Sequence, residues 1–114
     1  MTDLEYIVSK LSKEEILCQI AEEASELAQA ALKLRRAITG LNPTPLSVDA
    51  ATDDFFEELA DVTVAKDAYF ELVSDHIGCA REFQDYVYAI ADMKRKRWAE
   101  RLRAKEDEDD QSNN

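Results

Sequence analysis

The scarcity of glycine and proline limits this chain more than any other feature of its sequence. Only two residues of each kind occur among 114, which is too few for the many tight turns of a β-sandwich or a β-barrel. The good helix formers alanine, leucine, glutamate, lysine and arginine are plentiful. Hydrophobic residues make up 46% of the chain, too many for a disordered protein. The composition therefore predicts a single small all-α domain.

The hydrophobic pattern predicts four helices. The first covers residues 4–10 and the second runs from residue 12 to about residue 39. The third starts between residues 48 and 54 and continues to about residue 74, and the fourth covers roughly residues 79–104. Ser12 and Glu15 have the spacing of a capping box at the start of the second helix, and Gly40 supplies its stop. The two prolines fall between the second and third helices and predict a loop there. Long helices with short connections favour an antiparallel bundle of about four helices, which we expect oligomerisation to complete.

The charge of the chain excludes some classes of protein. There are 25 acidic residues against 14 basic ones, a formal net charge of −11, which disfavours a nucleic-acid binder that relies on overall charge. No apolar run approaches the roughly 18 residues that a membrane span needs, and residues 1–10 lack the pattern of a signal peptide. Cys18 and Cys79 form no ligand cluster and favour a reduced, cytoplasmic protein.

Charge changes sign near the end of the chain. Residues 94–103 hold six of the fourteen basic residues, whereas residues 105–114 hold five acidic residues and no large apolar side chain. We therefore expect one folded domain over residues 1–104, followed by an acidic, disordered tail over residues 105–114.

Two acidic pairs lie partly on the sides of the predicted helices that should be buried. The second predicted helix has one apolar side, which we expect to be buried and which consists of Ile16, Ile20, Ala24, Leu27, Ala31, Leu34 and Ile38. Glu23 falls at the edge of this apolar arc, and Glu26 lies one step further round. In the third helix, Glu58 and Asp61 project among apolar residues such as Ala65. If these helices pack face to face, four carboxylates meet in one half-buried site.

Such a site needs compensation, because the mutual repulsion of the carboxylates exceeds what the marginal stability of a small domain can absorb. Protonation, pairing with a basic side chain such as Lys66, or a hard divalent cation would each supply it. Ligands that are all oxygen, with no His or Cys, suit Mg²⁺ or Mn²⁺ rather than zinc. A solvated acidic surface is the simpler explanation for either pair alone, and both explanations stay open at this point.

Two acidic motifs resemble the EExxE…ExxD signature of MazG-like nucleotide pyrophosphohydrolases, a family of the all-α NTP pyrophosphatase superfamily. They are EEASEL at residues 22–27 and ELADV at residues 58–62. Further likeness lies in residues 26–33 and in the basic residues 94–97, so the resemblance covers roughly residues 14–103. The chain departs from the family in one respect: the 31 residues between Glu26 and Glu58 make a longer connection than usual.

The resemblance implies a homodimeric or homotetrameric enzyme that hydrolyses a nucleoside triphosphate to monophosphate and pyrophosphate. By matching positions, the Mg²⁺ ligands would be Glu23, Glu26, Glu58 and Asp61. The residues that bind the substrate would be Gln29, Lys33, Lys94 and Arg97. Glu22 completes the motif, and we expect it to act in catalysis by orienting the attacking water.

A hypothesis from a different class is a non-catalytic helical interaction protein. In that case the acidic residues and the basic segment 94–103 would be complementary docking surfaces. The placement of the acids distinguishes the two hypotheses, because docking charges have no need to lean into an apolar face.

Overall fold

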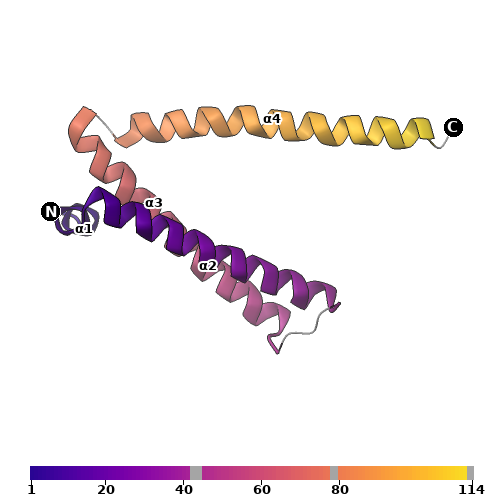
Figure 1. Cartoon of the computed structure of the whole chain (residues 1–114), viewed down its shortest axis with the longest axis horizontal. Helices are drawn as coiled ribbons and strands as arrows, with labels where there is room; N and C mark the ends of the chain where they lie inside the picture. The colour runs from indigo at the N-terminus through magenta and orange to yellow at the C-terminus, as the bar shows by residue number, and fades with distance from the viewer. Residues whose placement is uncertain (42–44, 78–79, 113–114) are drawn as a thin grey trace. The chain divides into compact units, whose positions relative to one another are not determined.

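The computed structural model describes residues 1–41, 45–77 and 80–112, which contain four α-helices and no strand, so the all-α prediction is confirmed. The helices are α1 (Asp3–Lys10), α2 (Lys13–Thr39), α3 (Val48–Ile77) and α4 (Ala80–Ser112) (Figure 1). They belong to two units, Met1–Ile77 with α1 to α3 and Gly78–Asn114 with α4. None of the described helices combines the length and apolar character that a membrane crossing requires.

Local hydrogen bonds fix the ends of α2 as the sequence predicted. The Glu15 backbone N–H donates to Ser12 Oγ over 3.1 Å, and the Ser12 N–H donates to Glu15 Oε2 over 2.8 Å, which completes the capping box. At the other end, Gly40 takes a left-handed conformation with φ of 66°, and its N–H donates to the Arg36 carbonyl over 2.9 Å. A residue with a Cβ would be strained in this conformation.

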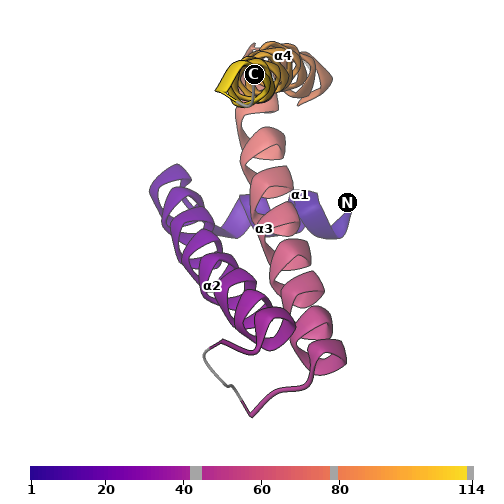
Figure 2. The same ribbon diagram turned by 90° about the vertical axis from the view of Figure 1, so that its right-hand side faces the viewer.

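Helices α2 and α3 lie side by side and antiparallel, and α1 lies across α3 (Figure 2). Small side chains fill most of the core between them. Among the residues whose burial is described, the buried ones are Ile16, Ala30, Ala51, Ala65, Ala68 and Phe70. Because four of these six are alanines, the two long helices can approach each other closely. The structure shows this helical hairpin with α1. The four-helix bundle and its oligomer stay predictions.

The buried face of α2 is rotated relative to the one predicted from its apolar residues. Ala24 and Ala31, which we expected in the core, are exposed, and Ile38 is 64% exposed. Ala30 is buried instead, and Glu23 is half-buried. Alanine is short enough to sit in a core or on a surface, so a helix with many alanines gives little information about its own rotation.

Helix α4 continues past its predicted end near residue 104 and stops at Ser112. The segment 105–112, which we expected to be a disordered tail, is therefore helical, and all its residues are exposed. The physical reason is that no glycine or proline interrupts the sequence between Ala80 and Ser112, while Glu, Lys, Arg and Gln are good helix formers. Likewise, α3 continues past the break predicted at Ser74 and Asp75 to Ile77, and Gly78 lies outside the described residues.

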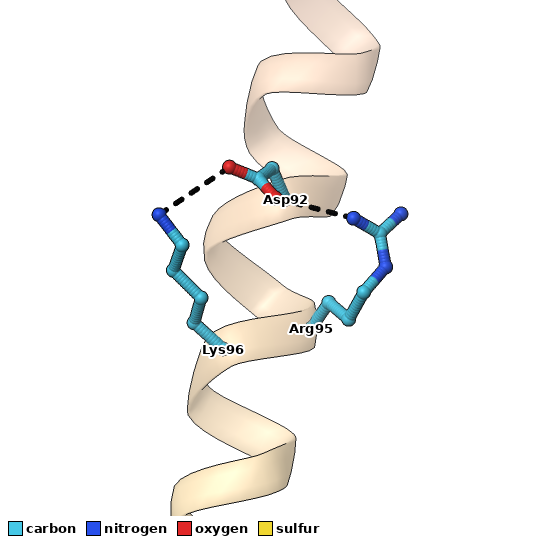
Figure 3. A network of polar contacts seen from close by, with 3 residues as sticks. All are labelled: Asp92, Arg95 and Lys96. Carbon is cyan, nitrogen blue, oxygen red and sulfur yellow. Dashed lines mark hydrogen bonds and ion pairs between the residues drawn. The ribbon is translucent and has the colours of Figure 1, made fainter.

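Exposed ion pairs connect successive turns of α4. Asp92 pairs with Arg95 over 3.2 Å and with Lys96 over 3.5 Å (Figure 3). Pairs at these spacings stabilise a helix by a few tenths of a kcal/mol each, about 0.2–0.5. These pairs stabilise α4 within its own unit. They also neutralise part of the positive charge of the basic segment 94–103.

Candidate metal centre

Four carboxylates from the two antiparallel helices converge. Glu23 and Glu26 come from α2, and Glu58 and Asp61 come from α3. Each offers one oxygen, and these oxygens lie within 4.8 Å of one another. The structure thus brings together the four acidic residues that the sequence analysis singled out, and we call them the acidic group.

The helix faces explain why this group lies at the interface. On α3, Ala51, Glu58 and Ala65 are spaced at seven residues and follow one line along the helix. Both alanines are buried, at 1% and 5% exposure, so Glu58 occupies the middle of the packed face. On α2, Glu23 holds the corresponding place between buried Ile16 and buried Ala30. Small neighbours let the helices approach, and the two acids fill the space between them.

The acidic group is half inside the protein and half at its surface. Glu23 and Glu58 are half-buried, whereas Glu26 and Asp61 are exposed. Glu23 Oε2 and Glu58 Oε2 are buried, and neither has a hydrogen-bond partner among the described residues. Buried carboxylate oxygens without a donor are rare in folded proteins. These two oxygens are therefore available as ligands for a cation held between α2 and α3.

The pKa values of the two half-buried acids, Glu23 and Glu58, reflect their burial and the closeness of the four carboxylates. Burial away from water raises the pKa of Glu58 above its ordinary value of 4.5, and the negative charges of Glu26, Asp61 and Glu23 add to the effect. Burial raises the pKa of Glu23 as well, and Glu26 and Asp61 contribute in the same direction. A hydrogen bond from Gln19 partly opposes the rise for Glu23. The ionised form of the acidic group is therefore disfavoured by burial and by mutual repulsion, and a bound cation would offset both effects.

The described residues supply no cation of their own to this group, since none of their Lys or Arg side chains lies within 4.0 Å of the four carboxylates. Lys66, which we considered as a partner, is exposed and contacts Asp67 over 3.7 Å. Four carboxylates with two unpartnered buried oxygens fit a hard divalent ion that also keeps water or phosphate ligands. The residues present are thus compatible with Mg²⁺ or Mn²⁺.

The acidic group separates two pockets. A polar pocket of about 300 Å³ lies on the side of Glu26 and Glu58, and Gln29, Lys33 and Asp54 also line it. A second pocket, of about 280 Å³, lies on the side of Glu23 and Asp61. Its other walls are mostly apolar and come from all three helices of the unit and from Leu11. A ligand held by the acidic group would thus have one polar and one apolar neighbourhood.

The structure brings some of the other predicted site residues to the acidic group and leaves others unassigned. Gln29 and Lys33 share the polar pocket with two of the acids, as the resemblance implied. Glu22 is exposed and outside the acidic group, and the Cys18 thiol donates to its Oε1 over 3.6 Å. Lys94 and Arg97 are exposed residues of α4, in the other unit. Their contact with substrate phosphates stays a prediction.

Two residues of the site were missed by the sequence analysis. Gln19 donates from Nε2 to Glu23 Oε1 over 2.7 Å, and Asp54 lines the polar pocket beside Glu58. Each lies four residues before an acid of the group, which places it on the same helix face. That spacing was the available signal.

No protein-family model, curated protein or solved structure matches the chain. The resemblance to MazG-like enzymes therefore stays one of motifs.

Proposed function

We propose that this protein is a Mg²⁺-dependent pyrophosphohydrolase that cleaves a nucleoside triphosphate between the α- and β-phosphates, with deoxynucleoside triphosphates as the first candidates. The observation that carries the proposal is the acidic group: four carboxylates within 4.8 Å, two of them with buried oxygens that have no partner among the described residues. Acidic residues that only serve as solvated surface need neither converge from two helices nor bury an oxygen.

The side chains around the group have complementary roles in this reaction. Mg²⁺ held there would neutralise phosphate charge and polarise the α-phosphate. Lys33 and Gln29 line the polar pocket next to Glu26 and Glu58, so they are placed to bind phosphate oxygens by charge and by hydrogen bonds. Lys94 and Arg97 would add positive charge from α4.

Glu22 is our assignment for the residue that orients water, because its carboxylate lies outside the acidic group and stays exposed. The water oxygen forms a bond to the α-phosphorus, and the bond from that phosphorus to the α–β bridging oxygen breaks. Pyrophosphate leaves with the bonding electrons, and the proton of the water passes to the Glu22 carboxylate. The products are a nucleoside monophosphate and pyrophosphate.

A homodimer or homotetramer is part of the proposal. Large apolar side chains stay exposed on α2 and α3, among them Leu32 at 53%, Phe56 at 60% and Val64 at 55%. Association of subunits would cover such exposed apolar side chains. Light scattering after gel filtration measures the mass in solution, and a monomer at micromolar concentration would contradict this part of the proposal.

The decisive test is a panel of canonical and damaged nucleoside triphosphates incubated with Mg²⁺, with both products identified. We expect release of pyrophosphate and monophosphate by the wild type. Glu58→Gln should abolish it, whereas Glu57→Gln, at an exposed neighbour outside the acidic group, should not. Phosphate released instead of pyrophosphate would refute the proposed bond cleavage.

An inert panel would favour the alternative, a non-catalytic interaction module. One observation supports that alternative: within its own unit, α4 exposes Tyr86 at 67%, Met93 at 63% and Trp98 at 65% beside its basic segment. Exposed aromatic residues together with basic ones are typical of docking surfaces.

A further inference from the structure

We propose that Gln19 is a positioning residue that holds Glu23 in the orientation required to bind the metal ion. The inference rests on the proposed metal-dependent function and adds to it a residue outside the acidic motifs.

The evidence is the different environment of the two Glu23 oxygens. Oε1 accepts a hydrogen bond of 2.7 Å from Gln19 Nε2. Oε2 is buried and has no partner among the described residues. The Gln19 amide thus fixes the terminal torsion of Glu23, which is otherwise broad. With one oxygen held, the other is left available within the acidic group.

Gln19 also differs from the other described neighbours of the acidic group, because it donates a side-chain hydrogen bond to one of the four acids. Among the described residues, its amide makes the one hydrogen bond that any of the four acids receives from a side chain outside the group. The half-buried acid of α3, Glu58, has a buried oxygen as well but receives no such hydrogen bond among the described residues. Of the two half-buried acids, therefore, the one on α2 is held in place and the one on α3 is not.

The chemistry of an amide suits this role. A glutamine donates a hydrogen bond without bringing a charge, so it neither competes with the cation nor adds a fifth negative charge. Partners that orient metal ligands through a hydrogen bond typically change metal affinity by 10–100-fold when they are removed. Gln19 lies one helical turn before Glu23 and is exposed on the side of the apolar pocket. A change at this position therefore leaves the helix intact.

The test is the affinity of the full chain for Mn²⁺ alone, measured by calorimetry without nucleotide. Gln19→Met keeps the length and removes the donor, and its dissociation constant should be at least tenfold higher than that of the wild type. Cys18→Ala is the matched control, because it removes a hydrogen bond to Glu22, which lies outside the acidic group. Its affinity should stay within twofold of the wild type. Circular dichroism of the metal-free variants verifies that the fold is kept.

The outcomes separate this inference from the proposed function. If the wild type binds no Mn²⁺ at millimolar concentration, the metal centre and the role of Gln19 are both wrong. If the wild type binds and Gln19→Met binds within twofold of it, only the role of Gln19 is wrong. Equal losses in Gln19→Met and Cys18→Ala would also overturn it, because the effect would then not be specific to Glu23.

A spectroscopic measurement on the unmodified protein gives an independent check. The side-chain amide signals of Gln19 should shift as Mg²⁺ is added, with the dissociation constant that calorimetry gives for Mg²⁺. Amide signals that stay unchanged at saturating Mg²⁺ would contradict the proposed contact with a metal ligand.

Discussion

Addition of Mg²⁺ to the metal-free protein should stabilise the unit Met1–Ile77, and substitution of Glu58 should remove this effect. The acidic group exists only when α2 and α3 are packed together, so the proposed ion would bind the folded state and not the unfolded chain. Glu58→Gln removes one proposed ligand and one half-buried negative charge. Glu57→Gln removes a neighbouring exposed charge outside the group and is the matched control.

The magnitude follows from mass action. At a Mg²⁺ concentration of 100 times the dissociation constant, the free energy of unfolding rises by about 2.7 kcal/mol. For a domain of this size, each kcal/mol moves the melting temperature by about 4–8 °C. The expected shift for the wild type is therefore on the order of 10–20 °C. The unit has the size of a small two-state domain, so the conversion applies to it.

Thermal unfolding followed by circular dichroism, without Mg²⁺ and with Mg²⁺ at about 100 times the dissociation constant that calorimetry gives, measures this shift. We expect the full shift in the wild type and in Glu57→Gln, and almost none in Glu58→Gln. Without metal, Glu58→Gln should melt above the wild type at pH 7, because burial and neighbouring charges disfavour the ionised Glu58. A similar Mg²⁺ shift in both variants would refute the reasoning, since the ion would then bind elsewhere.

Three further predictions follow from the same structure. Because the pKa values of Glu23 and Glu58 are raised from 4.5 in the folded state, that state binds more protons than the unfolded chain just above pH 4.5. The free energy of unfolding without metal should therefore fall as pH rises through this window, and urea titrations should show a weaker fall in the Glu23→Gln/Glu58→Gln variant. Ile16→Ala should lower the free energy of unfolding by about 2–5 kcal/mol, because Ile16 is 1% exposed; a loss under about 1 kcal/mol in urea would contradict its place in the core. Lys33→Met should raise the KM for the nucleotide in steady-state assays while metal affinity in calorimetry stays unchanged, and an unchanged KM would exclude Lys33 from the substrate site.

Features that depend on a few neighbouring residues could be predicted from the sequence. The capping box of Ser12 and Glu15 and the left-handed Gly40 are local, since each needs only a few residues to satisfy the free backbone groups at a helix end. The two acidic pairs were equally visible, because a spacing of three residues places two side chains on one helix face whatever the tertiary structure.

Features that depend on packing could not be predicted in this way. Choosing Ala30 over Ala31 as the buried alanine requires the position of α3, and alanine carries too little hydrophobic surface to decide it alone. The predicted end of α4 near residue 104 was wrong for a different reason. A run of acidic residues looks like a disordered tail by charge, but no residue in it breaks the helix before Ser112.

The acidic group depends on a local feature, the spacing of the acids along each helix, and on a tertiary feature, the register of the two helices. Because the first restricts the second, the group could be predicted from the sequence. Its acids have the same spacing of three residues on both helices. In an antiparallel pair, a single register therefore sets Glu23 level with Asp61 and Glu26 level with Glu58. The pockets agree with this register, since the first pair lines the apolar pocket and the second lines the polar one.

The long connection between α2 and α3 leaves this register to the helix faces and not to a tight turn. Buried alanines such as Ala51 and Ala65 hold the helices close on either side of Glu58. A larger side chain at either position would move the helices apart and separate the two acidic pairs without touching a carboxylate. The convergence of the four acids thus depends on small residues as much as on the acids, which is why the acidic motifs alone are insufficient to identify such a site.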